Sequence, residues 1–285
     1  MNKPVTIADL VEAKQEGRKI AAVSCYDYTT ARLVADAGAE MILVGDSAAQ
    51  IILGYDSTLP ATMEFMLEIT AAVHRAAPNL CIAADMPFLS YHTGISDAVR
   101  NAGRFVQKAG AQLIKIEATA AHLDVIKAVS DAGMAVMAHI GIRPQSITKS
   151  GKLRAEGTTA ELAFDLIKLA DEMVNAGASA ILLEGTAREV AKIITQTVPV
   201  PVISCGAGPD CDGQILIISD ILGLSPGPVP KFSKGYGEMK TEILRSINAY
   251  VEDVHRNSFP NDRHSYHIKS GELAKLEKML QNLKT

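Results

Sequence analysis

The chain has 285 residues, of which 48% are hydrophobic and 21% are charged, and it contains no Trp. These fractions are typical of globular proteins and exclude collagen-like, low-complexity and wholly disordered chains. The formal net charge of -4 gives no basic field of the kind that dominates nucleic-acid affinity, so we expect no nucleic-acid partner.

Helical and strand-like segments alternate along most of the chain. Thr6 begins a helical stretch that runs to about Glu16, with Asp9 placed as the acid of a capping box. Eight short apolar runs follow, and stretches with helical periodicity separate them. The runs are residues 20–26, 41–46, 80–85, 112–117, 135–140, 180–184, 200–205 and 215–219.

Four of these runs follow an Ala-Gly pair. The glycines of the pairs are Gly38, Gly110, Gly133 and Gly177. A glycine in the left-handed conformation commonly ends a helix before the chain turns into a strand. The repeated order of helix, glycine and strand therefore predicts βα units and a parallel sheet.

Eight such units predict an α/β chain folded as a (β/α)8 TIM barrel. The alternative is an open doubly wound sheet, but the GxGxxG fingerprint that often accompanies that fold is absent. We expect residues 1–267 to form a single barrel domain that includes the N-terminal helix. Residues 268–285 are expected to form a C-terminal helical tail, which either packs on its own subunit or makes a subunit contact.

Targeting signals are also absent from the sequence. No apolar run approaches the roughly 18–20 residues needed to span a bilayer, and residues 1–6 lack the apolar core of a signal peptide. The four cysteines form no CxxC pair and have no zinc-ligand spacing. We therefore expect reduced thiols, no membrane association and a cytoplasmic location.

Acidic residues mark the carboxyl ends of four predicted strands, and in a barrel these ends form the active-site face. The acids are Asp46, Asp85, Glu117 and Glu184. Lys115 is two residues before Glu117, so the two side chains share one face of their strand. One acid at a strand end is more often a helix cap, but four would cost stability unless they are paired or liganded. An all-oxygen cluster of this kind suits Mg²⁺ rather than Zn²⁺.

Two more strand ends carry reactive side chains. His139 ends an apolar run and is either a proton donor or substrate ligand, or a hydrogen-bonded structural histidine. Cys205 ends the seventh run, but no histidine and acid are spaced to activate it, so we expect a small packing residue.

Motifs along nearly the whole chain, from about Thr6 to His267, resemble those of ketopantoate hydroxymethyltransferases. The stretches GYDSTLP and GAGPDCDGQ are the most specific of them. The motifs are VGDS at 44–47, GYDSTLP at 54–60, ADMPF at 84–88, IKIE at 114–117, HIGIRPQS at 139–146, LE at 183–184, GAGPDCDGQ at 206–214, PKF at 230–232, and FP at 259–260 with His264.

The resemblance implies a barrel of the phosphoenolpyruvate mutase and isocitrate lyase superfamily. Enzymes of this family transfer a hydroxymethyl group from 5,10-methylenetetrahydrofolate to 3-methyl-2-oxobutanoate and form 2-dehydropantoate, on the route to pantothenate and coenzyme A. The resemblance also implies a Mg²⁺-stabilised enolate. It further implies small-molecule partners, namely a 2-oxo acid and a folate, and a cytoplasmic homo-oligomer for which a decamer is expected.

Roles for single residues follow from the same resemblance. Asp46 and Asp85 correspond to Mg²⁺ ligands that also hold the substrate, and Glu117 corresponds to a third metal partner acting partly through water. Ser47 and Lys115 correspond to ligands of the keto-acid carboxylate and oxygen.

Glu184 corresponds to the general base. The chemistry agrees, because forming a carbon–carbon bond next to a ketone needs a proton removed from an unactivated carbon. A chelated metal ion stabilises the charge that develops. A carboxylate that is partly desolvated and not bound to the metal then acts as the base.

The chain departs from the usual family pattern near the predicted site rim. Added Cβ atoms where the backbone approaches a ligand would alter the pocket for the acyl substrate, while the metal and base positions remain intact. The departures include Ala48, Ala49, Ala118, Arg143, Glu156 and Cys205.

Two other functions stay open at this point. One is a Mg²⁺-dependent carbon–carbon lyase or aldolase of the same superfamily, which would act on another 2-oxo acid without folate. The other is a non-catalytic barrel that serves as a binding or scaffold subunit, which loss of a metal or base residue would favour. No such residue is lost.

Overall fold

The computed structural model describes residues 3–283. The chain divides into two compact units, Met1–Tyr236 and Gly237–Thr285, and each is described separately.

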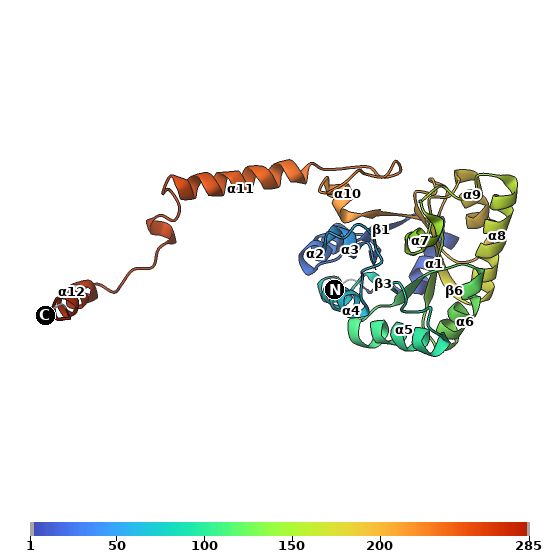
Figure 1. The fold of residues 1–285 in the computed structure, drawn as a ribbon, viewed down its shortest axis with the longest axis horizontal. Helices are drawn as coiled ribbons and strands as arrows, with labels where there is room; N and C mark the ends of the chain where they lie inside the picture. The colour runs from blue at the N-terminus through green and yellow to red at the C-terminus, as the bar shows by residue number, and fades with distance from the viewer. Residues whose placement is uncertain (1–2, 284–285) are drawn as a thin grey trace. The chain divides into compact units, whose positions relative to one another are not determined.

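Eight parallel strands of the first unit close into a barrel in chain order, and the last strand pairs with the first. Helices surround the barrel on its outer side (Figure 1). This architecture confirms the predicted (β/α)8 TIM barrel. The strands are β1 (Ile20–Ser24), β2 (Met41–Val44), β3 (Cys81–Asp85), β4 (Leu113–Glu117), β5 (Val136–Gly141), β6 (Ala178–Glu184), β7 (Val202–Cys205) and β8 (Gly213–Ile217).

The helices on the outside of the barrel end where the sequence predicts. Gly38, Gly110, Gly133 and Gly177 all have positive φ, as expected for residues that close a helix before a strand. The longer helices of this layer are α2 (Tyr28–Asp36), α4 (Met63–Ala76), α5 (Ile95–Ala109), α6 (Leu123–Asp131), α8 (Ala160–Asn175) and α9 (Arg188–Thr197). Short helices lie in the loops, namely α3 (Ala48–Ile51), α7 (Ile147–Ser150), α10 (Ile218–Leu222) and the 3-10 turns η1 (Ala120–His122) and η2 (Pro144–Ser146).

The predicted bounds of the eighth strand, residues 215–219, are wrong. The strand β8 runs from Gly213 to Ile217, and the chain enters α10 at Ile218. Strand β8 begins on a glycine because a Cβ at Gly213 would lie 2.6 Å from the Ile20 carbonyl oxygen of β1. A glycine is ordinarily a sign of a loop or a bulge, so the sequence pattern places the strand too late.

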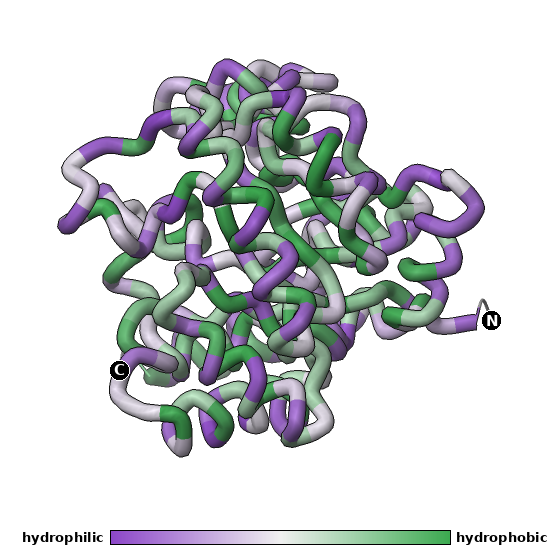
Figure 2. Tube along the Cα trace, turned by 90° about the vertical axis from the view of Figure 1, so that its right-hand side faces the viewer, coloured by the Kyte–Doolittle hydropathy of each residue, from purple (hydrophilic) through white to green (hydrophobic). Residues whose placement is uncertain are grey.

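Two apolar layers hold the barrel together. One lies between the strands and the outer helices, and the other fills the barrel interior. Hydrophobic segments run through the middle of the barrel in Figure 2. Leu10 and Ala13 of α1 (Ile7–Gln15) join the interior layer beside Ile20 and Met41, which begin β1 and β2. The helix α1 therefore closes the barrel at the amino ends of the strands.

The inward-facing side chains of β3 and β6 change from apolar to polar toward the carboxyl end of each strand. On β3 they are Cys81 and Ala83 and then Asp85, and on β6 they are Ala180 and Leu182 and then Glu184. Because the side-chain period of a strand is two, these polar ends share the inner face with the apolar residues before them. The fold therefore gathers polar groups at the carboxyl end of an otherwise apolar barrel.

The second unit contains α11 (Met239–His255), the 3-10 turn η3 (Asp262–His264) and α12 (Glu272–Asn282). None of its described residues is buried. The predicted domain boundary at residue 267 lies inside this unit and stays a prediction. No helix within residues 3–283 is long and apolar enough to cross a bilayer.

Candidate active site

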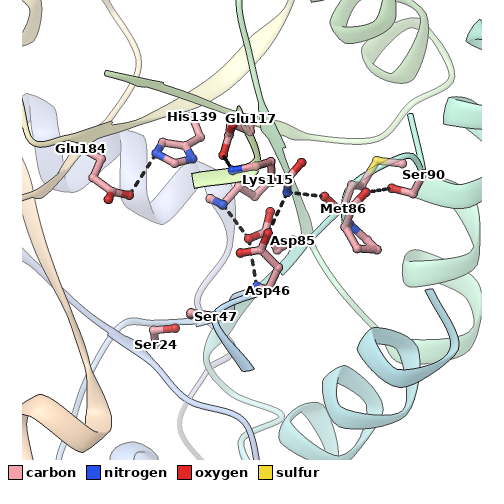
Figure 3. Close-up of polar contacts among 12 residues, drawn as sticks. Ser24, Asp46, Ser47, Asp85, Met86, Ser90, Lys115, Glu117, His139 and Glu184 are labelled. Atoms are coloured by element: carbon pink, nitrogen blue, oxygen red, sulfur yellow. Dashed lines mark hydrogen bonds and ion pairs between the residues drawn. The ribbon is translucent and has the colours of Figure 1, made fainter. Parts of the chain in front are cut away.

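A cavity of about 200 Å³ lies at the carboxyl ends of the strands. It brings together six of the seven predicted site residues, namely Asp46, Ser47, Asp85, Lys115, His139 and Glu184. Figure 3 shows Glu184 with His139 at one side and the Asp46–Asp85–Lys115 group at the other. Glu117, the seventh, is buried beside the cavity but does not line it.

Asp85 and Lys115 form a buried ion pair. They are register partners on β3 and β4, and Lys115 Nζ donates to Asp85 Oδ2 at 2.6 Å. The Asp46 backbone N–H donates to the same oxygen at 3.1 Å. Burial disfavours the charge on Lys115, but Asp85 and Asp46 outweigh that effect and raise the pKa of its ammonium.

The same burial acts on the carboxyl of Asp85. It raises the pKa of Asp85, Lys115 opposes the shift, and the negative Asp46 adds to it. One lysine thus faces two buried carboxylates, which is the electrostatic situation that a bound cation would relieve.

Gln145 holds two of the acidic residues in place, and no sequence pattern indicates this role. Its backbone N–H donates to Glu117 Oε2 at 2.9 Å, and its side-chain amide donates to Asp46 Oδ2 at 2.9 Å. The Tyr91 hydroxyl donates to Gln145 Oε1 at 2.7 Å, which fixes the amide's orientation. Ser146 Oγ donates to the other Glu117 oxygen at 3.2 Å, so both oxygens of Glu117 are already bonded.

Ser47 belongs to a chain of hydroxyl groups that no sequence pattern indicates. Its Oγ lies 2.7 Å from the Tyr26 hydroxyl, which accepts from Ser24 Oγ at 3.2 Å. Gly45 leaves the space between them open, because a Cβ there would lie 3.0 Å from Ser47 Oγ and 3.3 Å from Ser24 Oγ. The only sequence signal for Ser24 is its inward phase at the carboxyl end of β1.

His139 and Glu184 lie together on the opposite wall. His139 Nε2 is 3.2 Å from Glu184 Oε2, although neither ring nitrogen makes a hydrogen bond within the described residues. The Glu184 side chain is 18% exposed, whereas that of His139 is 1% exposed. Of these two residues, Glu184 is therefore the one that a bound molecule can reach.

Cys205 is the only one of the six rim departures named above that lines the cavity in the described part of the chain. Burial, together with the charge of Glu184, raises the pKa of its thiol well above the usual range. A protonated thiol is a poor nucleophile, which agrees with a packing role. Arg143 and Glu156 line a separate small depression of about 30 Å³.

The donor set fits a divalent metal ion. Asp85 Oδ1 is buried and has no hydrogen-bond partner within the described residues, so it is free to ligate. Residues 3–283 contain no group of three or more His, Cys, Asp or Glu side chains arranged as a complete site. A divalent ion such as Mg²⁺ is usually bound through one or two carboxylates and completes its shell with water and substrate oxygens, and Asp46 and Asp85 can supply two carboxylates at this cavity.

A larger depression of about 420 Å³ lies elsewhere, among residues that include Arg32, Glu40 and Asn79. It contains none of the predicted site residues. Volume alone is therefore no guide to the chemistry, and the smaller cavity with convergent polar groups is the candidate active site.

Solved structures share the fold of this barrel. The chain superposes on 2,3-dimethylmalate lyase, a phosphoenolpyruvate mutase/isocitrate lyase superfamily member, with a TM-score of 0.59 and 16% identity over 99% of this chain and 98% of that one. Phosphonopyruvate hydrolase in complex with oxalate and Mg²⁺ gives a TM-score of 0.58 at 14% identity, with 98% of each chain covered. These likenesses show that the barrel fold is shared.

Sequence comparison identifies the family within that class. The profile described as ketopantoate hydroxymethyltransferase matches residues 4–262, and the chain belongs to this family. The 3-methyl-2-oxobutanoate hydroxymethyltransferase of Hyperthermus butylicus is 46% identical over 276 residues, which cover 97% of this chain and 95% of the relative. The enzyme of that name from Geotalea daltonii is 44% identical over 266 residues, covering 93% and 100%. Membership of this family implies a divalent-metal-dependent enzyme that acts on small molecules.

Proposed function

We propose that the protein transfers a hydroxymethyl group from 5,10-methylenetetrahydrofolate to 3-methyl-2-oxobutanoate. The products are 2-dehydropantoate and tetrahydrofolate, and one water is consumed because a methylene becomes a hydroxymethyl group. The observation that carries the proposal is the convergence of Asp46, Asp85, Lys115 and Glu184 on one cavity of about 200 Å³. Family membership supports the choice of reaction.

Asp46 and Asp85 are the proposed Mg²⁺ ligands. The free Asp85 Oδ1 supports this role, as does the Lys115 bond that holds Asp85 Oδ2 in place. Glu117 is the proposed third partner through water, since its two oxygens already accept from Gln145 and Ser146. Bound Mg²⁺ would draw electron density from the 2-oxo group while the neighbouring C–H bond is broken.

Lys115 and Ser47 are the proposed ligands of the keto-acid carboxylate and oxygen. Lys115 supplies a fixed positive charge at the cavity wall, and the raised pKa of its ammonium keeps it protonated. The hydroxyl chain through Tyr26 fixes the direction of Ser47 Oγ. These two contacts would hold the small acid with its C3 atom toward the opposite wall.

Glu184 is the proposed general base that removes the C3 proton. Its partial exposure lets it reach a bound molecule, and it lies on the wall away from Lys115 and Asp85. The proton passes from C3 to the Glu184 carboxylate, and its electron pair remains on the substrate as an enolate. C3 of the enolate then bonds the one-carbon unit, both carbon–nitrogen bonds of that unit break, and water supplies the hydroxyl oxygen. His139, with both ring nitrogens unbonded, is a further candidate for proton transfer beside it.

The cellular setting belongs to the same proposal. We propose a cytoplasmic enzyme that assembles as a homo-oligomer, with a decamer as the expected form. Family membership supports this setting.

The test is an assay of the purified protein with 3-methyl-2-oxobutanoate and Mg²⁺, with and without the folate donor. Loss of the C3 proton signal in D₂O without donor, followed by NMR, would report proton abstraction. Formation of 2-dehydropantoate only with donor is the expected result. Cleavage of another 2-oxo acid without folate would instead establish a lyase or aldolase, and no exchange on any 2-oxo acid would favour a non-catalytic barrel.

A further inference from the structure

Asp220 is a buried carboxylate in the same cavity, and the mechanism proposed above does not use it. It is 6% exposed and lines the cavity from α10, the short helix directly after β8. Burying a carboxylate costs free energy unless it is paired or bonded. The burial of the Asp220 carboxylate therefore needs a stabilising partner, either within the protein or in a bound ligand.

Local structure satisfies only part of this side chain. Asp220 is the third residue of α10, a position from which an acid often caps the helix, but no side-chain cap bond is made there. Ser225 Oγ donates to Asp220 Oδ1. Within the described residues, Asp220 Oδ2 has no hydrogen-bond partner, and the carboxylate has no ion-pair partner.

The charge of Asp220 disfavours the keto acid as its ligand. Asp220 lines the cavity together with Cys205, Glu184 and Lys115. Burial raises the pKa of the Cys205 thiol, the charges of Glu184 and Asp220 add to the shift, and Lys115 opposes it. A 2-oxo acid is an anion and has no N–H donor, so a second carboxylate on this wall would repel it. A ligand for Asp220 must instead offer N–H or O–H donors.

Phe232 adds a flat apolar surface to this part of the cavity. Its ring lies against Gly206, where a Cβ would be 2.4 Å from Phe232 Cδ1, and Gly206 has a φ of +77°. Phe232 is 40% exposed and lines the cavity with Pro230. An exposed ring beside a buried acceptor suits a planar heteroaromatic ligand.

The cavity is large enough to enclose one of the two substrates but not the other. At about 200 Å³ it is smaller than the roughly 300–1,000 Å³ typical of pockets for drug-sized ligands. It therefore accommodates a small acid completely but only one end of a larger molecule. The larger ligand must reach the cavity past an exposed lining residue such as Phe232.

We propose that Asp220 binds the pterin ring of the one-carbon donor by accepting hydrogen bonds from its 2-amino and N3 N–H groups, while Phe232 packs against the ring face. This assignment rests on the proposed function, since it requires a reduced folate as the second substrate. Ser225 acts as a positioning residue, because its hydroxyl orients the Asp220 carboxylate.

The experiment measures binding of tetrahydrofolate by calorimetry in the full-length protein with Mg²⁺ and 3-methyl-2-oxobutanoate present. Asp220→Asn should raise the dissociation constant of tetrahydrofolate by about 10- to 100-fold, the usual effect of losing hydrogen bonds to a charged group. The dissociation constant of the keto acid should not rise, because the substitution removes a negative charge. Asp165→Asn, an exposed acid of α8, is the matched control and should leave both constants unchanged.

A 2-desamino analogue of tetrahydrofolate isolates the proposed contact. The wild type should bind the analogue more weakly than tetrahydrofolate, and Asp220→Asn should no longer distinguish the two. An equal loss of affinity for both ligands, or an altered melting temperature with unchanged affinity, would overturn the assignment. If Asp220→Asn does not fold, Phe232→Leu provides the test, and unchanged donor binding in that variant overturns the stacking contact.

The proposed function has its own separate readout. Absence of C3 proton exchange in the wild type would overturn that function and this inference with it. Normal exchange together with an unchanged tetrahydrofolate constant in Asp220→Asn would overturn only the role of Asp220.

Discussion

Lys115 and Asp85 are register partners on adjacent strands, and their side chains meet at 2.6 Å with almost no exposure to solvent. The lysine holds Asp85 Oδ2 and leaves Oδ1 without a hydrogen-bond partner among the described residues. The pair thus fixes the direction of the free oxygen, and a residue on β4 determines how a residue on β3 meets a ligand.

Replacing the lysine tests this pair. Lys115→Met leaves the buried Asp85 without its counter-charge, and breaking a buried pair typically costs about 3–5 kcal/mol. We expect the free energy of unfolding, measured by urea denaturation, to fall by that amount. Lys127→Met breaks an exposed pair on α6 and should cost about 1 kcal/mol or less. Equal stability of the two variants would show that the buried pair has no special role.

The metal ligands are tested by titration. Asp85→Asn removes the negative charge beside the free oxygen, and we expect Mg²⁺ affinity to fall by more than the ~10–100-fold that loss of an outer hydrogen-bond partner costs. Glu117→Gln, proposed to act through water, should weaken Mg²⁺ binding less. Calorimetric titration of both variants measures the difference, and an unchanged Asp85→Asn isotherm would remove Asp85 from the metal site.

The general base is tested by kinetics. Glu184→Gln keeps the shape of the side chain but cannot accept the C3 proton as a carboxylate does. We expect kcat to fall by ~10²–10⁴-fold, the usual contribution of general acid–base catalysis. Mg²⁺ binding serves as the check on folding, because Glu184 lies on the other wall from Asp85. Full turnover in this variant would exclude Glu184 from the mechanism.

Gln145 is tested by stability. Gln145 is 3% exposed. The substitution Gln145→Leu removes the amide donor to Asp46 and the acceptor for the Tyr91 hydroxyl. Loss of a hydrogen bond to a charged group costs about 1.5–3 kcal/mol, which for a domain of ~150–250 residues lowers the melting temperature by several degrees. Tyr91→Phe removes only the hydroxyl and should have a smaller effect in the same thermal scan. A Gln145→Leu melting curve that overlays the wild type would contradict this account.

The tail is tested by mass. Leu273, Leu276 and Leu280 of α12 are 52%, 42% and 50% exposed, and they form an apolar stripe at helical spacing. We expect truncation after residue 267 to reduce the oligomer mass in light scattering by more than the removed residues account for. The double variant Glu277→Gln and Lys278→Gln alters neighbouring polar positions and should leave the mass intact. An unaltered number of subunits after truncation would show that the stripe makes no subunit contact.

Strand positions were predictable because the strands are short and apolar, and because a helix-ending glycine precedes four of them. Seven of the predicted runs overlap β1 to β7 closely, and the eighth is displaced because β8 begins at Gly213. Because of the same displacement, the sequence does not indicate that Asp220 lines the site. A strand that extends to residue 219 would place this acid in a loop. In the structure it belongs to α10.

The candidate site was predictable where its residues end strands, and less so where loops supply them. Asp85, Lys115 and Glu184 follow from strand phase alone. Gln145 comes from the turn η2, where no periodicity indicates which way a side chain points. The bonding of Glu117 by Gln145 and Ser146 also escapes the sequence pattern, since it depends on the path of that loop.

The helix α1 has a consequence for the order of events in catalysis. Leu10 and Ala13 close the barrel at the amino ends of the strands. Substrates and products therefore enter and leave at the carboxyl ends. If the pterin sits outermost, against Phe232, then it arrives last and leaves first. A single opening predicts an ordered mechanism. The keto acid binds before the folate donor, and 2-dehydropantoate dissociates only after tetrahydrofolate has left.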